Sequence, residues 1–205
     1  MKPRDYDGLS YLLHIEKAHL AYDAVAIATR IMYQIGLHDQ RAWKHYSEFE
    51  TAMCQRVFWS LYCLDRAIAL ASGAPCIIQD ATVNVDLPLA FDDRQLIPGG
   101  SLPALSPTSS SVPYLQQMVH WARLYSDTCK TLSETTRYRS LTPETIETLD
   151  QKILSWFGGF PPQLTWNPDL LILDPTTNVP HYILRQCVIL LLVSRFLKSR
   201  RAATY

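Results

Sequence analysis

The sequence predicts an all-α fold, an irregular multi-helix domain with a long Pro-rich connection between its second and third helices. Three observations support this prediction. Apolar residues recur at helical spacing in several segments, caps and Gly or Pro stops bound those segments, and no alternating β pattern is long enough to build a sheet. The chain has 205 residues, of which 48% are hydrophobic. This is enough for one core of ordinary size, so residues 1–205 are expected to form one domain.

The first helix is predicted over residues 9–35. Its apolar side chains recur at steps of three and four residues, which places them on one face of a helix. Gly36 follows directly and is expected to stop the helix, because glycine readily adopts the left-handed conformation common at helix ends. The predicted face consists of Ile15, Ala18, Tyr22, Val25, Met32 and Ile35.

A capping box predicts where the second helix begins. In the segment SEFE, the Ser47 hydroxyl can accept from an unpaired backbone amide while Glu50 reaches back to the amide of Ser47. The helix is therefore expected over residues 48–72. Gly73 and Pro75 should end it, because glycine favours the helix end and proline cannot continue the helix.

Proline spacing separates this helix from the later ones. Six of the chain's thirteen prolines lie in residues 73–113, and no helix is expected to persist through them. Helicity resumes over residues 112–138. The next helix is expected after Thr142, a good N-cap followed by a proline suited to the first helical position, and to end at residues 158–159. A last helix, apolar in its middle, is predicted over residues 179–200.

Composition limits the classes of function. The formal net charge is +0, and DNA-binding surfaces need clustered Lys and Arg, so this chain does not read as a DNA-binding module. Five cysteines without a CxxC pair fit reduced thiols inside a cell and make a structural zinc site improbable. The most apolar run, residues 187–193, is far shorter than the roughly 20 residues that span a bilayer, and the chain has no signal peptide, so no membrane segment is expected.

The sequence contains no pattern typical of catalysis. The nucleophile elbow, the phosphate loop and the HExxH and SxxK motifs are absent, and the six histidines have no metal-ligand spacing. Asp92 and Asp93 form an acidic pair in FDDRQ, but Leu96 stands where a metal-binding DDxxD box has its third acid. A turn or cap role is therefore expected for this pair, and the chain is not expected to be an enzyme.

The second predicted helix carries charges on faces that are otherwise apolar. Arg56 and Arg66 share one stripe with Trp59, and Asp65 shares another with Tyr62. An uncompensated buried ion costs several kcal/mol, so one interpretation is an ion-pair and hydrogen-bond network that joins this helix to its neighbours. The other is that an arginine contacts an anionic effector. The residues alone leave both interpretations open.

Four short segments, in this order, carry a resemblance to a known family: IGLHD, RVFWSLYCLDR, SGAP and VNVDLP. Together they resemble the middle homology region of fungal zinc-cluster transcription factors, the fungal-specific transcription factor domain. The apolar segment HYILRQCVILLLVSRFL is more loosely similar to the family's last helices, so the resemblance covers most of the chain. The matching positions are Gly36, Leu37, His38, Arg56, Phe58, Trp59, Asp65, Arg66, Gly73, Pro75, Asp80, Leu87 and Pro88.

Three positions depart from the family's usual pattern. Gln55 stands where the first of two basic residues is usual, Ala52 where an acid is common, and Ala74 replaces the arginine of a G-R-P turn. These departures weaken any anion- or partner-contacting role that the extra basic residues serve in the family.

The resemblance implies a non-catalytic regulatory domain that acts in the nucleus. It implies control of transcription in response to a small-molecule effector or a regulatory protein. Family members read DNA through an N-terminal six-cysteine cluster that binds two zinc ions. That cluster is absent from this sequence, so no cofactor is expected in this chain, which looks like a fragment without its upstream helices. Two alternatives are an all-α enzyme and a structural scaffold without a ligand-sized cavity, and the oligomeric state stays open.

Overall fold

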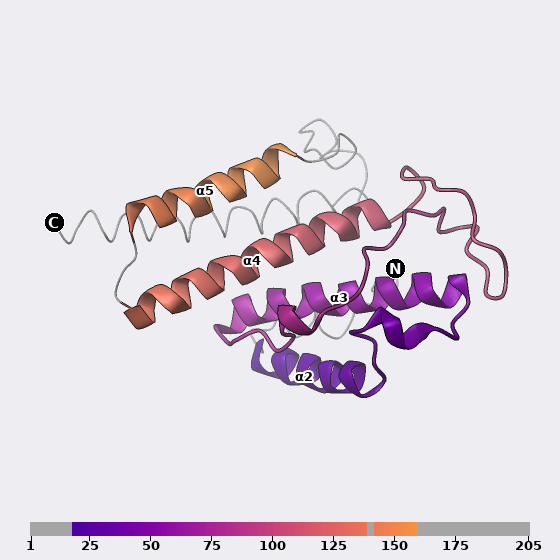
Figure 1. Ribbon diagram of the computed structural model, residues 1–205, viewed down its shortest axis with the longest axis horizontal. Coiled ribbons are helices and arrows are strands. Elements are labelled where there is room, and N and C mark those ends of the chain that lie inside the picture. Colours follow the sequence, from indigo (N-terminus) through magenta and orange to yellow (C-terminus); the bar gives the residue numbers. More distant parts are fainter. Residues whose placement is uncertain (1–17, 139–141, 160–205) are drawn as a thin grey trace, which may run out of the picture. The chain divides into compact units, whose positions relative to one another are not determined.

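The computed structural model describes residues 18–138 and 142–159 (Figure 1). Its described part contains four α-helices, two short 3-10 helices and two isolated β-bridges, with no named strand among these residues. The predicted all-α class is confirmed. The chain divides into two compact units, Met1–Ala122 and Arg123–Tyr205. The start of the first predicted helix and the helix predicted over residues 179–200 lie outside the described residues.

Helix α2 spans Ala18–Gln34. Its buried face includes Ala21, Val25 and Met32, because these positions follow the three- and four-residue steps of one helical face. Gly36 adopts a positive φ of 71° just after the helix, as predicted. Ile35 does not belong to the buried face and is 60% exposed, since it lies beyond the last helical residue on the outward side.

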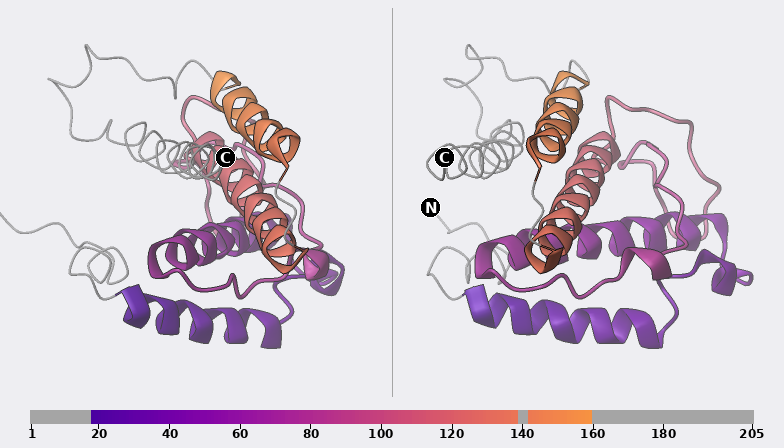
Figure 2. Two further views of the ribbon diagram at one scale, coloured as in Figure 1. Left: turned by 90° about the vertical axis from the view of Figure 1, so that its left-hand side faces the viewer. Right: turned by 60° about the vertical axis from the view of Figure 1, so that its left-hand side comes forward.

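Helix α3 spans Glu48–Ser72 and begins and ends as predicted. Both hydrogen bonds of the capping box between Ser47 and Glu50 are present, and Gly73 closes the helix in the left-handed conformation with φ 67°. Because of this conformation a side chain at position 73 would be strained. Helix α3 runs alongside α2 in the opposite direction (Figures 1 and 2), and Ile68 packs with residues of α2 in a small buried cluster.

A short 3-10 helix, η1 (Gln40–Trp43), forms part of the connection between α2 and α3. The buried Trp43 ring donates its Nε1 proton to the carbonyl of Gly36 at 3.2 Å. Asp39 caps η1 and accepts from Arg41 and, at 2.7 Å, from Asn84. This connection is thereby tied to a segment far away in the sequence.

That distant segment is the return segment, which we define as residues 75–93. It contains the short 3-10 helix η2 (Asp80–Thr82) and otherwise has no regular structure, as its prolines predict. Two isolated bridges fix it, Asp39 with Asn84 and Phe91 with Leu105. The return segment starts at the end of α3 and passes back along it towards the beginning of the helix (Figure 1).

Helix α4 spans Val112–Tyr138, the range that the sequence predicts. Its first turns belong to the first unit, where Val112, Val119 and Trp121 are buried. Helix α5 spans Pro143–Gly158 in the second unit. The Thr142 hydroxyl accepts from the amide of Thr145 at 3.2 Å, the predicted N-cap. Among the helices that the structure describes, none combines the length and the hydropathy needed to cross a membrane.

Candidate functional site: the contacts between α3 and the return segment

Asp65 lies in the centre of the contact between α3 and the return segment. Its side chain is fully buried, with 0% exposure. One carboxylate oxygen accepts from the amide of Ile77 at 2.9 Å, and the other accepts from the amide of Ile78 at 3.0 Å. The third donor to this carboxylate is Arg66, whose Nη1 lies 2.8 Å from it. Asp65 therefore uses its charge to hold the turn that follows α3, in the same way that a carboxylate caps exposed backbone amides.

Arg66 continues the network from Asp65 to Asp80. Its Nη2 donates to the carbonyl of Ile78 at 2.9 Å and to the Asp80 carboxylate at 2.7 Å, and the side chain is only 1% exposed. The guanidinium carbon lies 3.7 Å from the centre of the Tyr62 ring, and the Tyr62 hydroxyl donates to Asp80 at 2.6 Å. A buried cation thus has two carboxylates, a carbonyl and an aromatic face around it.

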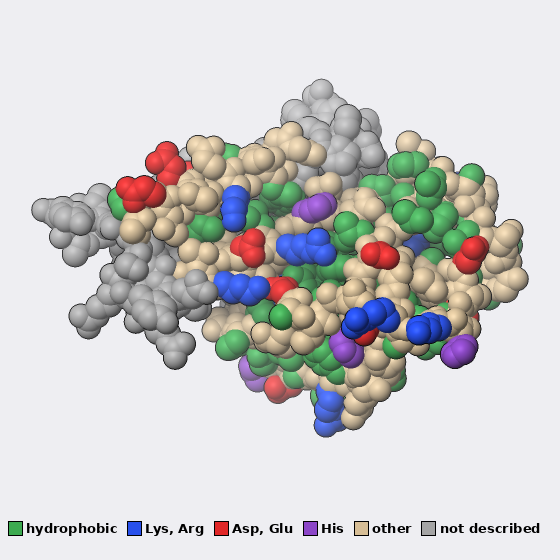
Figure 3. Space-filling model, in the orientation of Figure 1, with side chains coloured by type: hydrophobic (Ala, Val, Ile, Leu, Met, Phe, Trp, Pro, Cys, Tyr) green, Lys and Arg blue, Asp and Glu red, His purple; other side chains and the backbone are tan. Residues whose placement is uncertain are grey.

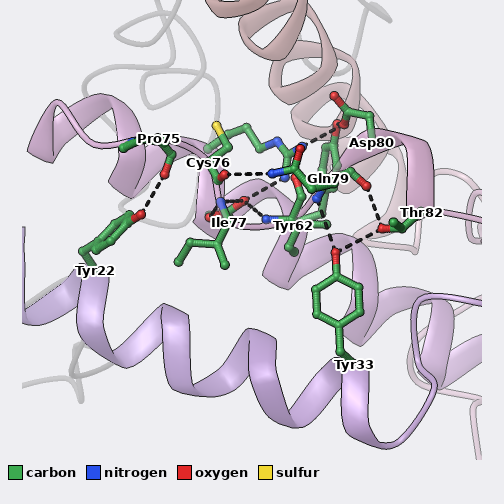
Figure 4. A network of polar contacts seen from close by, with 12 residues as sticks. Tyr22, Tyr33, Tyr62, Pro75, Cys76, Ile77, Gln79, Asp80 and Thr82 are labelled. Carbon is green, nitrogen blue, oxygen red and sulfur yellow. Dashed lines mark hydrogen bonds and ion pairs between the residues drawn. The ribbon is translucent and has the colours of Figure 1, made fainter.

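Helix α2 contributes hydroxyl groups to the same region (Figure 4). Tyr22 donates to the carbonyl of Pro75 at 2.9 Å. The Tyr33 hydroxyl lies 3.0 Å from that of Thr82 and accepts from the amide of Gln79 at 3.3 Å. The first half of the return segment is consequently fixed by both α2 and α3.

Trp59 holds the middle of the return segment. Its ring is fully buried and donates Nε1 to the carbonyl of Asp86 at 2.9 Å. Gln40 joins this contact: its side-chain oxygen accepts from the amide of Asp86 at 3.0 Å and from Gln55 at 3.1 Å. Gln55 stands at a position that is usually basic in the family pattern, and here its amide serves as a neutral donor.

Arg56 lies in a separate contact. It donates Nη1 to Asp93 at 2.7 Å, and the side chains of the pair are 15% and 33% exposed. Its Nε and Nη2 atoms are buried and have no hydrogen-bond partner. Asp93 also accepts from the amide of Ser111 at 2.8 Å, at the start of α4. The structure brings Tyr62, Asp65 and Arg66 together and places Arg56 outside their network.

The acidic pair has the turn and cap roles that the sequence predicts. Asp92 accepts from the amide of Arg94 at 3.0 Å, two residues further on, while Asp93 caps α4 through Ser111. Burial on its own would raise the pKa of Asp93. The hydrogen bonds from Ser111 and the ion pair with Arg56 outweigh burial and leave the pKa of Asp93 below its ordinary value.

The matching positions of the family pattern are distributed over the same contacts. Leu37 and Phe58 are buried, and Gly36 and Gly73 take the positive φ angles described above. The remaining members lie in the return segment: the Pro75 carbonyl and the Asp80 carboxylate accept hydrogen bonds, Leu87 is half-buried, and Pro88 is buried.

His38 is a second matching position, besides Arg56, whose side chain has a buried polar atom without a hydrogen-bond partner. Its backbone carbonyl accepts from the amide of Asn84 at 2.9 Å, and its ring centre lies 4.8 Å from that of Tyr33. The Nδ1 atom is buried and has no hydrogen-bond partner. His38 thus contributes a backbone contact to the return segment and a ring contact to α2.

The contacts follow one direction along the molecule. As α3 is followed backwards through Arg66, Trp59 and Arg56, their partners advance along the return segment from residues 78–80 to residue 86 and then residue 93. Polar side chains of α3 therefore hold the return segment, which has no regular pattern of backbone hydrogen bonds of its own. The sequence did not point to Gln40 and Asn84, since a side-chain amide in a loop gives no signal of a partner far away in the sequence.

The polar groups of this site hold the return segment in place. Its carboxylates and guanidinium groups already pair with each other and with backbone atoms at the distances given above. Burial raises the pKa of the nearby Cys63 thiol to about 12, so this thiol stays protonated and unreactive at neutral pH. Within residues 18–138 and 142–159, no group of three or more His, Cys, Asp and Glu side chains is placed to hold a metal ion.

Asp93→Asn is expected to destabilise the protein by about 1 kcal/mol at pH 7, because a partly exposed, charge-assisted contact is lost. The folded-state pKa of Asp93 is lowered. Its contribution is therefore present above the unfolded value of about 3.9 and is lost as the pH falls through the lower folded value. Urea unfolding of both proteins at pH 7 and near pH 2.5 should show a difference that shrinks on acidification. A difference that is constant or grows would contradict this assignment, and Asp92→Asn serves as the control.

Comparisons with known proteins place the chain among transcription regulators. Residues 10–158 match the family described as the fungal specific transcription factor domain, and the chain belongs to this family. Its members and the curated relatives are transcription factors and not enzymes. The resemblance seen in the four sequence segments is thereby confirmed.

The relatives are much longer proteins. An ABC-transporter-regulating transcription factor of Aspergillus fumigatus is 31% identical over 140 residues, which are 67% of this chain and 15% of the relative. The transcriptional activator protein acu-15 of Neurospora crassa is 22% identical over 141 residues, 69% of this chain and 15% of that protein. Pyrimidine pathway regulatory protein 1 of Saccharomyces cerevisiae is 29% identical over 90 residues, 40% and 10% of the respective chains. No solved structure gave a significant match.

Proposed function

We propose that this chain is the regulatory, middle homology domain of a fungal zinc-cluster transcription factor. It controls DNA-templated transcription in the nucleus by binding a small-molecule effector or a regulatory protein. Family membership and the names of the relatives support a role in transcription. In this proposal the zinc ions and the reading of DNA belong to an N-terminal six-cysteine module of the parent protein.

The observation that carries the proposal is the pairing of the arginines in the family motif. Arg66 is 1% exposed and bonds two carboxylates, and Arg56 pairs with Asp93. DNA affinity comes mainly from Lys and Arg side chains that reach phosphates. These two arginines instead hold the return segment, and the formal net charge of the chain is +0. These observations favour a regulatory role for the domain over direct contact with DNA.

A reporter assay in a fungal host tests the regulatory role. A heterologous DNA-binding module is joined to an activation segment either through residues 1–205 or through a flexible linker of equal length. We expect the 205-residue chain to change reporter output severalfold and to make it depend on the growth medium. Equal output from both fusions in every medium tested would contradict the proposal. A fluorescent tag on the parent protein checks its nuclear localisation.

A mobility-shift assay with the purified chain tests the division of roles. At physiological salt we expect no sequence-specific binding to genomic DNA fragments. Sequence-specific binding below micromolar concentration would move DNA recognition into this domain and overturn the proposed division.

A further inference from the structure

Helix α2 has a second apolar face, which the first unit leaves exposed. Leu20, Ile27 and Ile31 are 40%, 55% and 49% exposed, and Ala24 between them is also exposed. At 100° per residue, Ile27 points about 160° away from the buried Val25. Hydrophobic side chains gather over α2 in Figure 3, with acidic and basic side chains beside them. The exposed residues form a continuous stripe rather than scattered surface positions.

The spacing of this stripe is that of a coiled-coil seam. Leu20, Ala24, Ile27 and Ile31 follow one another at steps of four, three and four residues, which are the steps between d and a positions of a heptad. Two charged residues occupy the g positions that border the seam, Asp23 and Arg30, and both are exposed. They lie on the same edge, one heptad apart, with opposite charges.

We propose that this face of α2 binds α2 of a second copy of the chain in an antiparallel, two-fold symmetric pair. In an antiparallel coiled coil each a residue faces a d residue of the other helix. Here this puts Leu20 against Ile31 of the second copy and Ala24 against its Ile27. The same register places Asp23 opposite Arg30 of the second copy, and the two-fold axis repeats the pair.

The charges favour this occupant and this direction. In antiparallel helix pairs the two g edges meet, whereas in parallel pairs a g edge meets an e edge. The e edge of α2 carries Ala21 and Ala28, which offer no charge to Asp23 or Arg30. A parallel pair would therefore leave both charges unmatched. In one two-fold register the apolar residues pair with each other and the opposite charges face each other. A two-fold interface requires this self-complementarity.

The length of α2 sets the expected strength. Its 17 residues extend over about 25 Å, which allows about two heptads of seam. We expect so short a seam to bury less than the roughly 1,200 Å² that stable complexes bury. We therefore expect a dimer that dissociates in the micromolar range.

Sedimentation velocity of the 205-residue chain over a range of concentrations tests the pair. We expect dimers at tens of micromolar, and we expect Ile27→Glu to remain monomeric at those concentrations with an unchanged circular dichroism spectrum. Ile97→Glu is the matched control, because Ile97 is 64% exposed outside α2, and it should dimerise like the parent chain. A parent chain that stays monomeric at 100 μM, or a dimer that Ile27→Glu leaves intact, would overturn the proposal.

Charge reversal tests the direction of the pair. Asp23→Arg or Arg30→Asp alone sets like charges opposite each other twice in the dimer, and each should weaken association about fivefold or more. The double variant D23R/R30D restores opposite charges and should recover the affinity of the parent chain. If the single variants dimerise as well as the parent, or if the double variant is as weak as the single ones, the antiparallel arrangement is wrong.

Discussion

Asp65→Ala is expected to lower the free energy of unfolding by about 3 to 5 kcal/mol, the range found when one partner of a buried ion pair is removed. The carboxylate is 0% exposed and accepts from two backbone amides and from Arg66. Its removal leaves those amides without their acceptor in a buried site, and it leaves Arg66 with Asp80 and the Ile78 carbonyl but without the partner of its Nη1. The loss is comparable to the whole stability of a marginal domain, about 5 to 15 kcal/mol.

Thermal melts monitored by circular dichroism measure this effect. For a chain of this length the loss corresponds to roughly 10 °C or to failure to fold. Lys44→Ala is the surface control, since Lys44 is exposed, and it should melt with the parent. A melting temperature of Asp65→Ala within about 2 °C of the parent would mean that these contacts do not hold the domain together.

Arg66→Met is expected to cost about 3 kcal/mol, whereas Arg56→Met should cost about 1 kcal/mol or less. Loss of Arg66 leaves Asp65 buried with two amide donors and no cation, and it removes two bonds to the return segment. The Arg56 pair is less buried than the Arg66 pair, with Arg56 15% and Asp93 33% exposed. Asp93 also keeps its bond from Ser111 when Arg56 is replaced. Methionine also removes two buried nitrogen atoms that have no partner, which offsets part of the loss.

Urea unfolding of both arginine variants, of Asp65→Asn and of a double variant distinguishes these contributions. Asp65→Asn combined with Arg66→Met removes both charges, so the double variant should be more stable than the sum of the single losses predicts. Equal losses for Arg56→Met and Arg66→Met would contradict the separation of the two contacts. Strict additivity in the double variant would show that Asp65 and Arg66 do not stabilise each other.

Local signals in the sequence were sufficient to place α3 and α5. The capping box at Ser47 and Glu50 defines the start of α3, and Gly73 defines its end. Thr142 and Pro143 do the same for the start of α5. These predictions succeed because a cap bonds to backbone atoms within a few residues, so the partners are adjacent in the sequence and need no knowledge of the fold.

The partners of the charged residues could be predicted only in part. A buried helix with three charges implies that something neutralises them, and the structure shows carboxylates and backbone groups in that role. The sequence did not reveal that Asp65 pairs with its own neighbour Arg66, or that Arg56 belongs to a different contact. Neighbours on a helix point about 100° apart, so their pairing depends on how the return segment curves around both side chains.

The sequence by itself determined the all-α class, the bounds of α3, α4 and α5 and the membership in a family of fungal transcription factors, because these follow from periodicity, caps and short motifs that act within a few residues. The tertiary structure decided which acids meet Arg56 and Arg66, and that α2 buries one apolar face and exposes another. Those outcomes depend on the path of an irregular segment from residue 75 to residue 93. That path is set by the summed contacts with α2, α3 and the start of α4, since the segment has no regular hydrogen-bond pattern of its own.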